Sequence, residues 1–192
     1  VHNTFGLRPA LAKGSKEIYE LPAGPLAMAV GTEFRRESFE DTAASSYAKG
    51  EILGGSQLGS KNASRTVGAV FAELNVPVVK NVEVQLAARF DHYSDFGNTV
   101  NPKVAMRWQP LKSILLRSSW GTGFRPPNLY DLYTPLSQGR TGNSFDDPLR
   151  CPTTGLPEDC NRNFFLLNGG NPKLEPETSR QFNAGALWVP LS

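Results

Sequence analysis

The chain has 192 residues, of which 39% are hydrophobic, and this composition predicts a folded chain, neither disordered nor collagen-like. Its formal net charge is only +2, from 20 Lys and Arg against 18 Asp and Glu, so no sustained basic field indicates nucleic acid or an anionic membrane surface as a partner. No stretch approaches the roughly 18 consecutive apolar residues that a membrane-spanning helix needs. Membrane-spanning β-strands remain possible, because they need no such run. The N-terminus shows no signal-peptide pattern, so we expect the chain to begin within a longer protein.

Stretches of alternating apolar and polar residues recur along the chain, and this two-residue period predicts β-strands. The first expected strand is a short one at 16–21. The others lie at 26–35, 66–77, 82–93, 99–110, 113–121 and 179–190. We therefore predict an all-β antiparallel meander of about seven strands, each near ten residues long where the alternation is clear.

The alternation divides the side chains of each strand between two faces of different chemistry. In residues 82–93, one face carries Val82, Val84, Leu86, Ala88 and Phe90, and the other carries Glu83, Gln85, Ala87, Arg89 and Asp91. Residues 99–110 and 113–121 repeat this division. The charged residues expected on the polar face are Glu33, Arg35, Glu83, Arg89, Asp91, Lys103, Arg107 and Arg117.

The expected connections differ in length in a regular way. Tight turns are predicted at 22–25, 78–81 and 110–112, and long loops rich in Gly, Ser, Asn and Pro at 37–65 and 122–176. In an up-and-down chain the tight turns fall at one end, and the long loops fall at the other with the short turn at 94–98. Such strands, tilted by about 40°, span roughly 25 Å, which matches an outer-membrane barrel with short periplasmic turns and long external loops.

Aromatic residues are expected near both ends of the strands, as in the two girdles of a membrane barrel. Trp108 and Trp188 each lie two residues before a proline at the short-turn end. Near the opposite rim lie Phe90, Tyr93 and Trp120. A soluble β-sandwich shows the same alternation with its apolar face turned inward, so the alternation alone does not separate the two architectures. The one-sided loop lengths and the two aromatic belts favour the barrel.

The segment "GTGFRPPNLYDLY" at 121–133 interrupts the strand pattern. Its two glycines allow tight backbone, and its two adjacent prolines are incompatible with a strand interior. Residues 128–133 have room for about two helical turns. We therefore expect the strand to stop abruptly at 121 and the segment to form a catalytic loop, a binding loop or a packed corner.

Cys151 and Cys160 lie close together in "RCPTTGLPEDC", a stretch dense in turn residues. Their proximity predicts a disulfide and hence an oxidising compartment, the alternative being two reduced thiols. His2 and His92 lie far from both cysteines along the chain, so we expect no metal site and no cofactor.

Enzymatic activity is not predicted. Glu175 and Glu177 have the spacing of a local acid pair, but Pro176 between them indicates a structural turn, and a glycosidase needs two carboxyl groups facing one sugar. The sequence contains no HExxH, Walker A or GxSxG motif.

Five stretches, taken in order, resemble one known family. They are "LPAGPLAMAVGTEFRRESF", "AELNVP", "AARFDHYSDFGNTVNPKVAMRWQP", "LLRSSWGTGFRPPNLYDLY" and "GGNPKLEPETS". The resemblance is to the TonB-dependent receptors of the Gram-negative outer membrane, and it runs through much of residues 20 to 190. It implies a barrel of about 22 strands, occluded by an N-terminal plug domain. It also implies import of a scarce ligand such as a ferric siderophore, cobalamin or saccharide with energy from the inner-membrane TonB complex.

Several parts of the family pattern are missing from this chain. It shows no plug, no TonB-contacting box and no terminal aromatic strand. About seven strands supply only around a third of such a wall, so the resemblance implies that residues 1–192 are an internal piece of the barrel domain. The implied partners are a small-molecule ligand such as a metal chelate or oligosaccharide, the TonB complex through the absent plug, and outer-membrane lipid.

In the family, the segment like 121–133 forms the rim where a strand enters an external loop, which makes Arg125, Tyr130 and Tyr133 candidates for ligand binding. The alternative is that Arg125 packs against a carboxylate and the tyrosines seal the barrel mouth. Opposite charges at the two ends of the long loop predict that Arg125 or Arg117 pairs with Glu175 or Glu177.

Two other functions remain open at this point: a passive porin-like channel, and a secreted β-sandwich that acts as a binding or adhesion module. The barrel predicts an uncovered apolar face, whereas a sandwich predicts that a second sheet of the same chain covers it. The residues that decide between them are Val84, Leu86, Val104, Met106, Ile114 and Leu116.

Overall fold

The structure, a computed structural model, describes residues 2–51 and 59–189. The chain divides into two compact units. We call Gly6–Glu37, Arg65–Pro127 and Glu175–Ser192 the sheet unit, and Val1–Phe5, Ser38–Ser64 and Asn128–Leu174 the loop unit.

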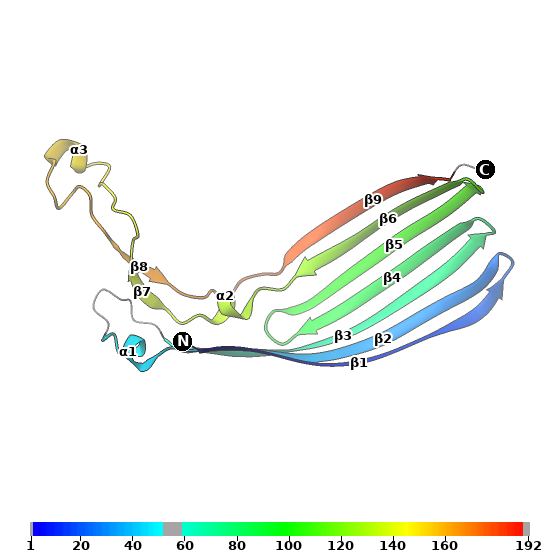
Figure 1. The fold of residues 1–192 in the computed structure, drawn as a ribbon, viewed down its shortest axis with the longest axis horizontal. Coiled ribbons are helices and arrows are strands. Elements are labelled where there is room, and N and C mark those ends of the chain that lie inside the picture. The colour runs from blue at the N-terminus through cyan, green and yellow to red at the C-terminus, as the bar shows by residue number, and fades with distance from the viewer. Residues whose placement is uncertain (1, 52–58, 190–192) are drawn as a thin grey trace. The chain divides into compact units, whose positions relative to one another are not determined.

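The main sheet has seven strands in the order β1-β2-β3-β4-β5-β6-β9, and neighbouring strands lie side by side in Figure 1. The strands are β1 (His2–Leu21), β2 (Gly24–Thr42), β3 (Lys61–Val79), β4 (Val82–Tyr93), β5 (Gly97–Leu111), β6 (Ile114–Arg125) and β9 (Glu177–Trp188). The pairs from β3 through β9 are antiparallel. The predicted all-β antiparallel meander is confirmed.

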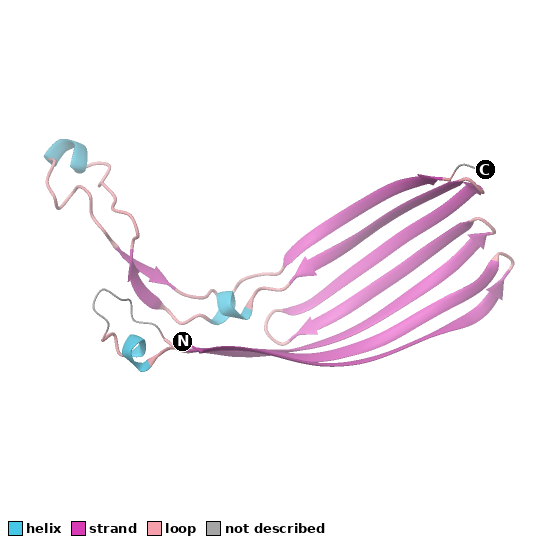
Figure 2. Ribbon diagram, viewed as in Figure 1, coloured by secondary structure: helices cyan, strands magenta, loops and turns pink. Residues whose placement is uncertain are grey.

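The long connection between β6 and β9 carries a smaller antiparallel sheet of β7 (Ser137–Arg140) and β8 (Phe165–Asn168). Figure 2 shows how little of the described chain is helical. The helices are α1 (Ser45–Ala48), α2 (Leu129–Tyr133) and α3 (Cys151–Thr154). In the part of the chain that the structure describes, no helix is long and apolar enough to cross a membrane.

The turns follow the predicted division by length. Two-residue turns at 22–23, 80–81 and 112–113 join β1 to β2, β3 to β4 and β5 to β6 at one end of the sheet. The connections from β2 to β3, from β4 to β5 and from β6 to β9 lie at the opposite end of the sheet, and the long loops are among them. Residues 52–58 of the predicted loop 37–65, and Pro190 after Trp188, lie outside the described residues.

Several strands run further than the alternation predicted. β1 spans 20 residues where only 16–21 were expected, and β2 and β3 extend to Thr42 and back to Lys61, into the predicted loop. The predicted stop at 121 is wrong, since Gly121 pairs with Gln181 and the ladder continues to Arg125 and Glu177. A strand can continue without apolar alternation because its backbone hydrogen bonds to the neighbouring strand hold it in place. The strand β6 ends where Pro126 follows Arg125, because proline has no N–H to donate.

The apolar face of the sheet has no cover. The register places Val84 opposite Met106 and Leu86 opposite Val104. Leu86, Val104 and Met106 are 40%, 42% and 40% exposed, and none of the six deciding residues is buried. The β-sandwich interpretation is therefore wrong, because no second sheet of the described chain covers this face.

The aromatic belts are found with one exception. Trp108 and Trp188 are exposed at the short-turn end of the apolar face, and Phe90 and Trp120 are exposed nearer the other end of the same face. The stretch from Val82, which pairs with Trp108, to Phe90 rises over eight residue steps and corresponds to roughly 20 Å along the membrane normal. Tyr93 does not belong to the belt, because its position in the register puts it on the polar face, where it is only 2% exposed.

Candidate functional site

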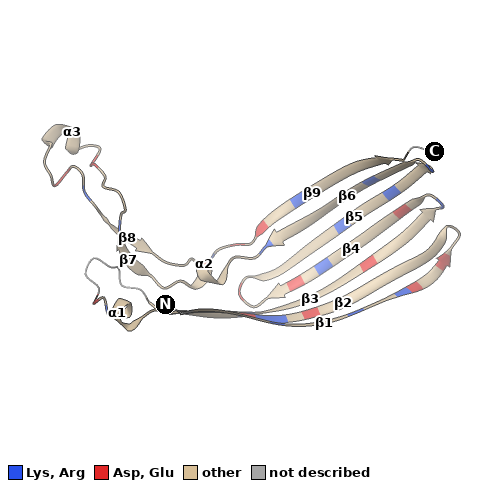
Figure 3. Cartoon of the chain, in the orientation of Figure 1, with Lys and Arg blue, Asp and Glu red and all other residues tan. Residues whose placement is uncertain are grey.

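The polar face of the sheet carries its charged side chains in rows across neighbouring strands. The register aligns Glu83, Arg107, Arg117 and Gly185 in one such row. Figure 3 shows how the acidic and basic residues recur along the strands. On the β2, β3 and β4 part of this face we define an ionic network, which consists of Glu33, Arg35, Glu37, Arg65, Arg89, Asp91 and Asp95.

Arg35 lies at the centre of the network on β2. Its guanidinium donates to Glu33 Oε1 at 2.9 Å and to Glu37 Oε1 at 2.7 Å, and both acids lie two residues away on the same strand face. The remaining terminal nitrogen donates to the hydroxyl of Tyr93 at 2.7 Å. Each of the three guanidinium nitrogens thus donates a hydrogen bond, and together these bonds link β2 to β4.

Arg65 is the most deeply buried cation of the network, with 6% of its side chain exposed. It donates to Glu37 Oε2 at 2.6 Å, to Asp95 Oδ2 at 3.3 Å and to the carbonyl oxygen of Pro127 at 2.8 Å. Its guanidinium also lies 5.2 Å from the centroid of the Tyr93 ring. A charge this buried is stable only when it is paired, so these contacts are needed for the local fold.

Arg89 on β4 forms ion pairs with one acidic residue on β2 and one on its own strand. It contacts Glu33 at 2.7 Å and Asp91 at 2.9 Å. Its guanidinium lies 5.9 Å from the ring of Phe71, and that ring occupies the space above Gly31. A Cβ at residue 31 would lie 2.2 Å from Phe71 Cζ, so only glycine fits under this ring as it stands.

Tyr93 packs between aromatic residues as well as cations. Its ring stacks on Phe96 at 4.4 Å and meets the edge of Phe124 at 5.7 Å. Sequence reasoning placed Glu33, Arg35, Arg89 and Asp91 on this face. It missed Glu37, Arg65 and Asp95, which fell in segments predicted to be loops.

Arg125, a predicted ligand-binding residue, forms an ion pair with Glu177 at 2.6 Å. The two residues lie directly opposite each other on β6 and β9, and both are largely exposed, 76% and 69% of the side chain. This confirms one of the four predicted pairings of the two motifs. The guanidinium retains accessible donors, so binding of a ligand by Arg125 stays a prediction.

Tyr130 and Tyr133, the other predicted ligand-binding residues, lie on α2 in the loop unit and are each 42% exposed. Tyr130 accepts a hydrogen bond from Lys61 Nζ at 2.9 Å, and its ring meets the edge of Phe39 at 5.8 Å. Their role in binding also stays a prediction.

The helix α2 is positioned by contacts with both ends of the long loop. Asn128 caps it by accepting a hydrogen bond from the backbone N–H of Tyr130 at 3.2 Å. Gly170 donates to the carbonyl oxygen of Thr134 at 2.7 Å, and a Cβ at 170 would lie 2.6 Å from the carbonyl oxygen of Leu132. This close approach requires glycine and returns the chain to α2.

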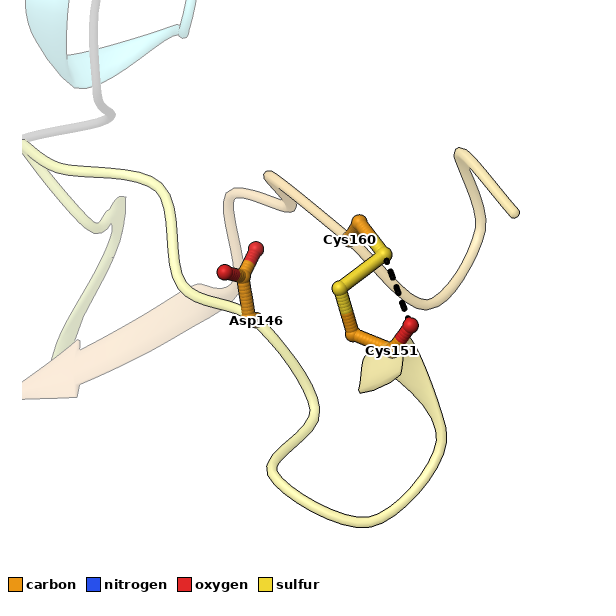
Figure 4. A group of neighbouring side chains, drawn as sticks. All are labelled: Asp146, Cys151 and Cys160. Atoms are coloured by element: carbon orange, nitrogen blue, oxygen red, sulfur yellow. Dashed lines mark hydrogen bonds between the residues drawn. A yellow bond between two sulfur atoms is a disulfide. The ribbon is translucent and has the colours of Figure 1, made fainter. Parts of the chain in front are cut away.

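The long loop also contains a disulfide between Cys151 and Cys160, with Cα atoms 5.1 Å apart. Figure 4 shows Asp146 beside it, and the carboxylate and the two sulfur atoms lie within 4.8 Å of one another. Because the sulfurs are bonded to each other, neither is a thiolate that could bind a metal ion. Asp146 instead accepts a hydrogen bond from the backbone N–H of Asn161 at 2.7 Å.

Asp147 holds the chain that enters α3. Its Oδ1 accepts hydrogen bonds from the backbone N–H groups of Leu149 at 2.8 Å and Arg150 at 3.0 Å. These bonds, that of Arg150 first, stabilise the carboxylate and hold the pKa of Asp147 below its ordinary 3.8.

Comparison with known proteins agrees with this architecture. The family described as "TonB dependent receptor-like, beta-barrel" matches residues 3–190. No curated protein matches the chain significantly in sequence.

Solved structures with the same fold include the ferric enterobactin receptor PfeA of Pseudomonas aeruginosa, at 20% identity and a TM-score of 0.72 over 98% of this chain and 25% of that one. One such PfeA structure is in complex with enterobactin. The siderophore receptor PirA of Acinetobacter baumannii matches at 20% identity and a TM-score of 0.66, over 97% of this chain and 25% of that one.

The chain spans about a quarter of the length of these structures. At 20% identity these solved structures show only that the fold is the same. The match of the family to residues 3–190 shows that this chain is related to it. The chain belongs to the family of TonB-dependent receptor-like β-barrels, which are outer-membrane receptors.

Proposed function

We propose that residues 1–192 form part of the barrel wall of a TonB-dependent receptor that imports a scarce ligand across the outer membrane, with a ferric siderophore as the first candidate. The observation that carries this proposal is the two-faced sheet, in a chain that belongs to a receptor family. Its apolar face, uncovered within the described chain, suits lipid, and its charged face suits a wet interior.

The ligand class rests on similarity to siderophore receptors, whose printed ligands include enterobactin. Cobalamin and oligosaccharides are the competing ligands. In this proposal the plug and the remaining strands come from the rest of the protein that contains this chain, and the plug couples the barrel to the TonB complex.

The test is uptake by cells of the source bacterium. A strain lacking the gene that encodes this chain should lose energy-dependent uptake of one labelled ligand among ferric enterobactin, cobalamin and a maltooligosaccharide, and the intact gene should restore it. Uptake that persists after the proton gradient is collapsed would indicate a passive channel. Unchanged uptake of all three would refute the choice of ligands.

The same assay tests the predicted ligand contacts. Tyr133→Ala, which truncates a 42% exposed side chain of α2, should weaken uptake of the ligand without changing the amount of receptor in the membrane. Tyr19→Ala, a 67% exposed tyrosine near the short-turn end of β1, is the matched control. Equal uptake by both variants and the unaltered protein would remove Tyr133 from the binding surface.

A further inference from the structure

The buried guanidinium of Arg65, on β3, is bonded to three segments that lie far apart in the sequence. Its partners are Glu37 on β2, Asp95 in the turn between β4 and β5, and the carbonyl oxygen of Pro127. All four residues belong to the sheet unit, and Pro127 is its last residue before the long connection that follows β6. One side chain therefore joins three strands and a turn to the point where this connection leaves the sheet unit.

The bond to Pro127 holds the backbone at that point. The strand β6 ends at Arg125, and Pro126 and Pro127 have no N–H with which to extend the ladder. The carbonyl oxygen of Pro127 instead accepts a hydrogen bond from Arg65 at 2.8 Å, and a charged donor makes such a bond stronger. The bond thus anchors the chain between the end of β6 and Asn128, which caps α2.

Aromatic contacts join the same segments independently of the ion pairs. The ring of Tyr93, on β4, lies 5.2 Å from the guanidinium of Arg65. This ring also stacks on Phe96 in the turn between β4 and β5, at 4.4 Å, and meets the edge of Phe124 on β6, at 5.7 Å. The polar and the aromatic contacts therefore agree that the turn and the end of β6 are packed around Arg65.

We propose that Arg65 is a positioning residue, which sets the direction in which the long connection leaves β6 by holding the carbonyl group of Pro127. Tyr130 and Tyr133, the predicted ligand contacts, follow this point within six residues of the sequence. An effect of Arg65 on ligand binding therefore rests on the proposed function, whereas its effect on the connection does not.

Arginine suits this task because its donors lie on three nitrogens in a rigid fork. Nε of Arg65 donates to Glu37, and Nη1 donates to both Asp95 and Pro127. Lysine carries the same charge on a single nitrogen and has no such fork. Arg65→Lys therefore keeps the charge and removes the geometry, which separates a positioning role from simple charge neutralisation.

The first test measures the position of the connection in the complete receptor that contains this chain. Spin labels are attached at Lys112→Cys, in a tight turn, and at Leu136→Cys, a 72% exposed residue after α2. Arg65→Lys should broaden the distribution of distances between the two labels, because the carbonyl group of Pro127 loses its donor. A receptor without the two added cysteines gives the labelling background.

Arg89→Lys is the matched control. Arg89 belongs to the same ionic network, but its described ion pairs are with Glu33 and Asp91, both within strands, so the substitution should leave the distribution unchanged. Glu37→Gln is a milder variant of the anchor, because it removes the charge of one partner of Arg65 and keeps an oxygen acceptor. It should broaden the distribution less than Arg65→Lys does, and it keeps the test decisive if Arg65→Lys yields little folded receptor.

The second test is ligand uptake by cells that make the complete receptor. Arg65→Lys should raise the half-saturating ligand concentration about tenfold, the order expected from the loss of one hydrogen bond to a charged donor, at an unchanged maximal rate per receptor. A residue needed only for folding would lower the amount of receptor in the membrane and leave the half-saturating concentration unchanged.

An unchanged distance distribution in both Arg65→Lys and Glu37→Gln would overturn the positioning role, and so would equal broadening in Arg89→Lys. Normal uptake together with an unchanged distribution would overturn this role and leave the proposed function intact. Broadening confined to the variants of the anchor would support the role even if none of the three ligands is taken up, and in that case the proposed function would fail by itself.

Discussion

At the scale of single residues, buried charges lie beside buried apolar residues in the interior of the sheet unit. Val67, Ala69 and Tyr93 are buried apolar residues of the sheet unit, and Arg65 and Asp91 are buried beside them. Paired and hydrogen-bonded charges of this kind tie β2, β3 and β4 to one another. The contribution of one such charge depends strongly on whether it is buried or exposed.

Arg65→Ala should reduce the free energy of unfolding by about 3 to 5 kcal/mol, because it leaves Glu37 and Asp95 without their shared cation. Arg125→Ala, which removes an exposed ion pair, should cost about 1 kcal/mol or less. Urea unfolding of the chain in lipid vesicles measures both. Similar losses for the two variants would show that the burial of Arg65 does not matter.

Gly31→Ala should destabilise the sheet by about 1 to 3 kcal/mol, because its Cβ would lie 2.2 Å from the ring of Phe71. Combining it with Phe71→Leu should recover part of the loss, since the two sites share one space. Gly14→Ala, where nothing lies within 4 Å of the added Cβ, is the control. If the double variant is no more stable than the two single losses predict, the ring is not the obstacle.

At the scale of elements, the long connection from β6 to β9 is an ordered loop with its own structure. It begins at α2, contains the β7–β8 hairpin and the disulfide, and returns to α2 through Gly170. The loop can therefore hold its shape by local contacts while the strands hold theirs by cross-strand pairing. Two of these local contacts, the disulfide and the hydrogen bonds to Asp147, can be tested by experiment.

Cys151 and Cys160 should show no free thiol in denatured, unreduced protein, because they form a disulfide and the outer membrane is an oxidising setting. Titration with a thiol reagent before and after reduction gives the count. Two reactive thiols per chain before reduction would contradict the pairing.

The turn at Asp147 should lose order in acid. Its carboxylate has a pKa below the ordinary 3.8, so its stabilisation is complete above 3.8 and is lost as the pH falls through the lower, folded value. The backbone amide signals of Leu149 and Arg150, followed by NMR, should shift with that midpoint. Asp147→Asn, which cannot titrate there, should remove the transition, and a midpoint at or above 3.8 would contradict the assignment.

At the scale of the whole molecule, the chain has an apolar face and two outer strands, each with one edge that no other described strand pairs. β1 and β9 end the seven-stranded order, and the apolar face bears exposed Leu86, Val104 and Met106. Contiguous exposed apolar surface and open strand edges are rare in soluble monomers.

We therefore expect the chain to need detergent or lipid, or else to self-associate. Trp108 and Trp188 fluorescence should be quenched by bromine atoms on lipid chains near the interface, whereas Tyr93, on the polar face, should be shielded from them. Sedimentation without detergent is the complementary measurement. A soluble monomer with quenching by aqueous acrylamide alone would contradict the barrel wall.

Much of the architecture could be predicted from local pattern. The strand at 82–93 was predicted with the bounds that β4 has, and the tight turns and the division of faces followed from alternation and turn residues. The Arg125–Glu177 pair followed from opposite charge at the two ends of a loop. For the candidate site, Tyr130 and Tyr133 stay predictions of the family resemblance.

The rest was decided by contacts between distant residues. Alternation determined which residues share a face of each strand, because that is a property of the backbone period. It did not determine that β6 continues to Arg125, since the ladder that holds Gly121–Arg125 comes from Glu177–Gln181, which lies 52 to 60 residues later in the chain. Nor did it place Arg65 with Glu37 and Asp95, or Phe71 over Gly31, because these contacts depend on the register between strands, which only the assembled sheet sets.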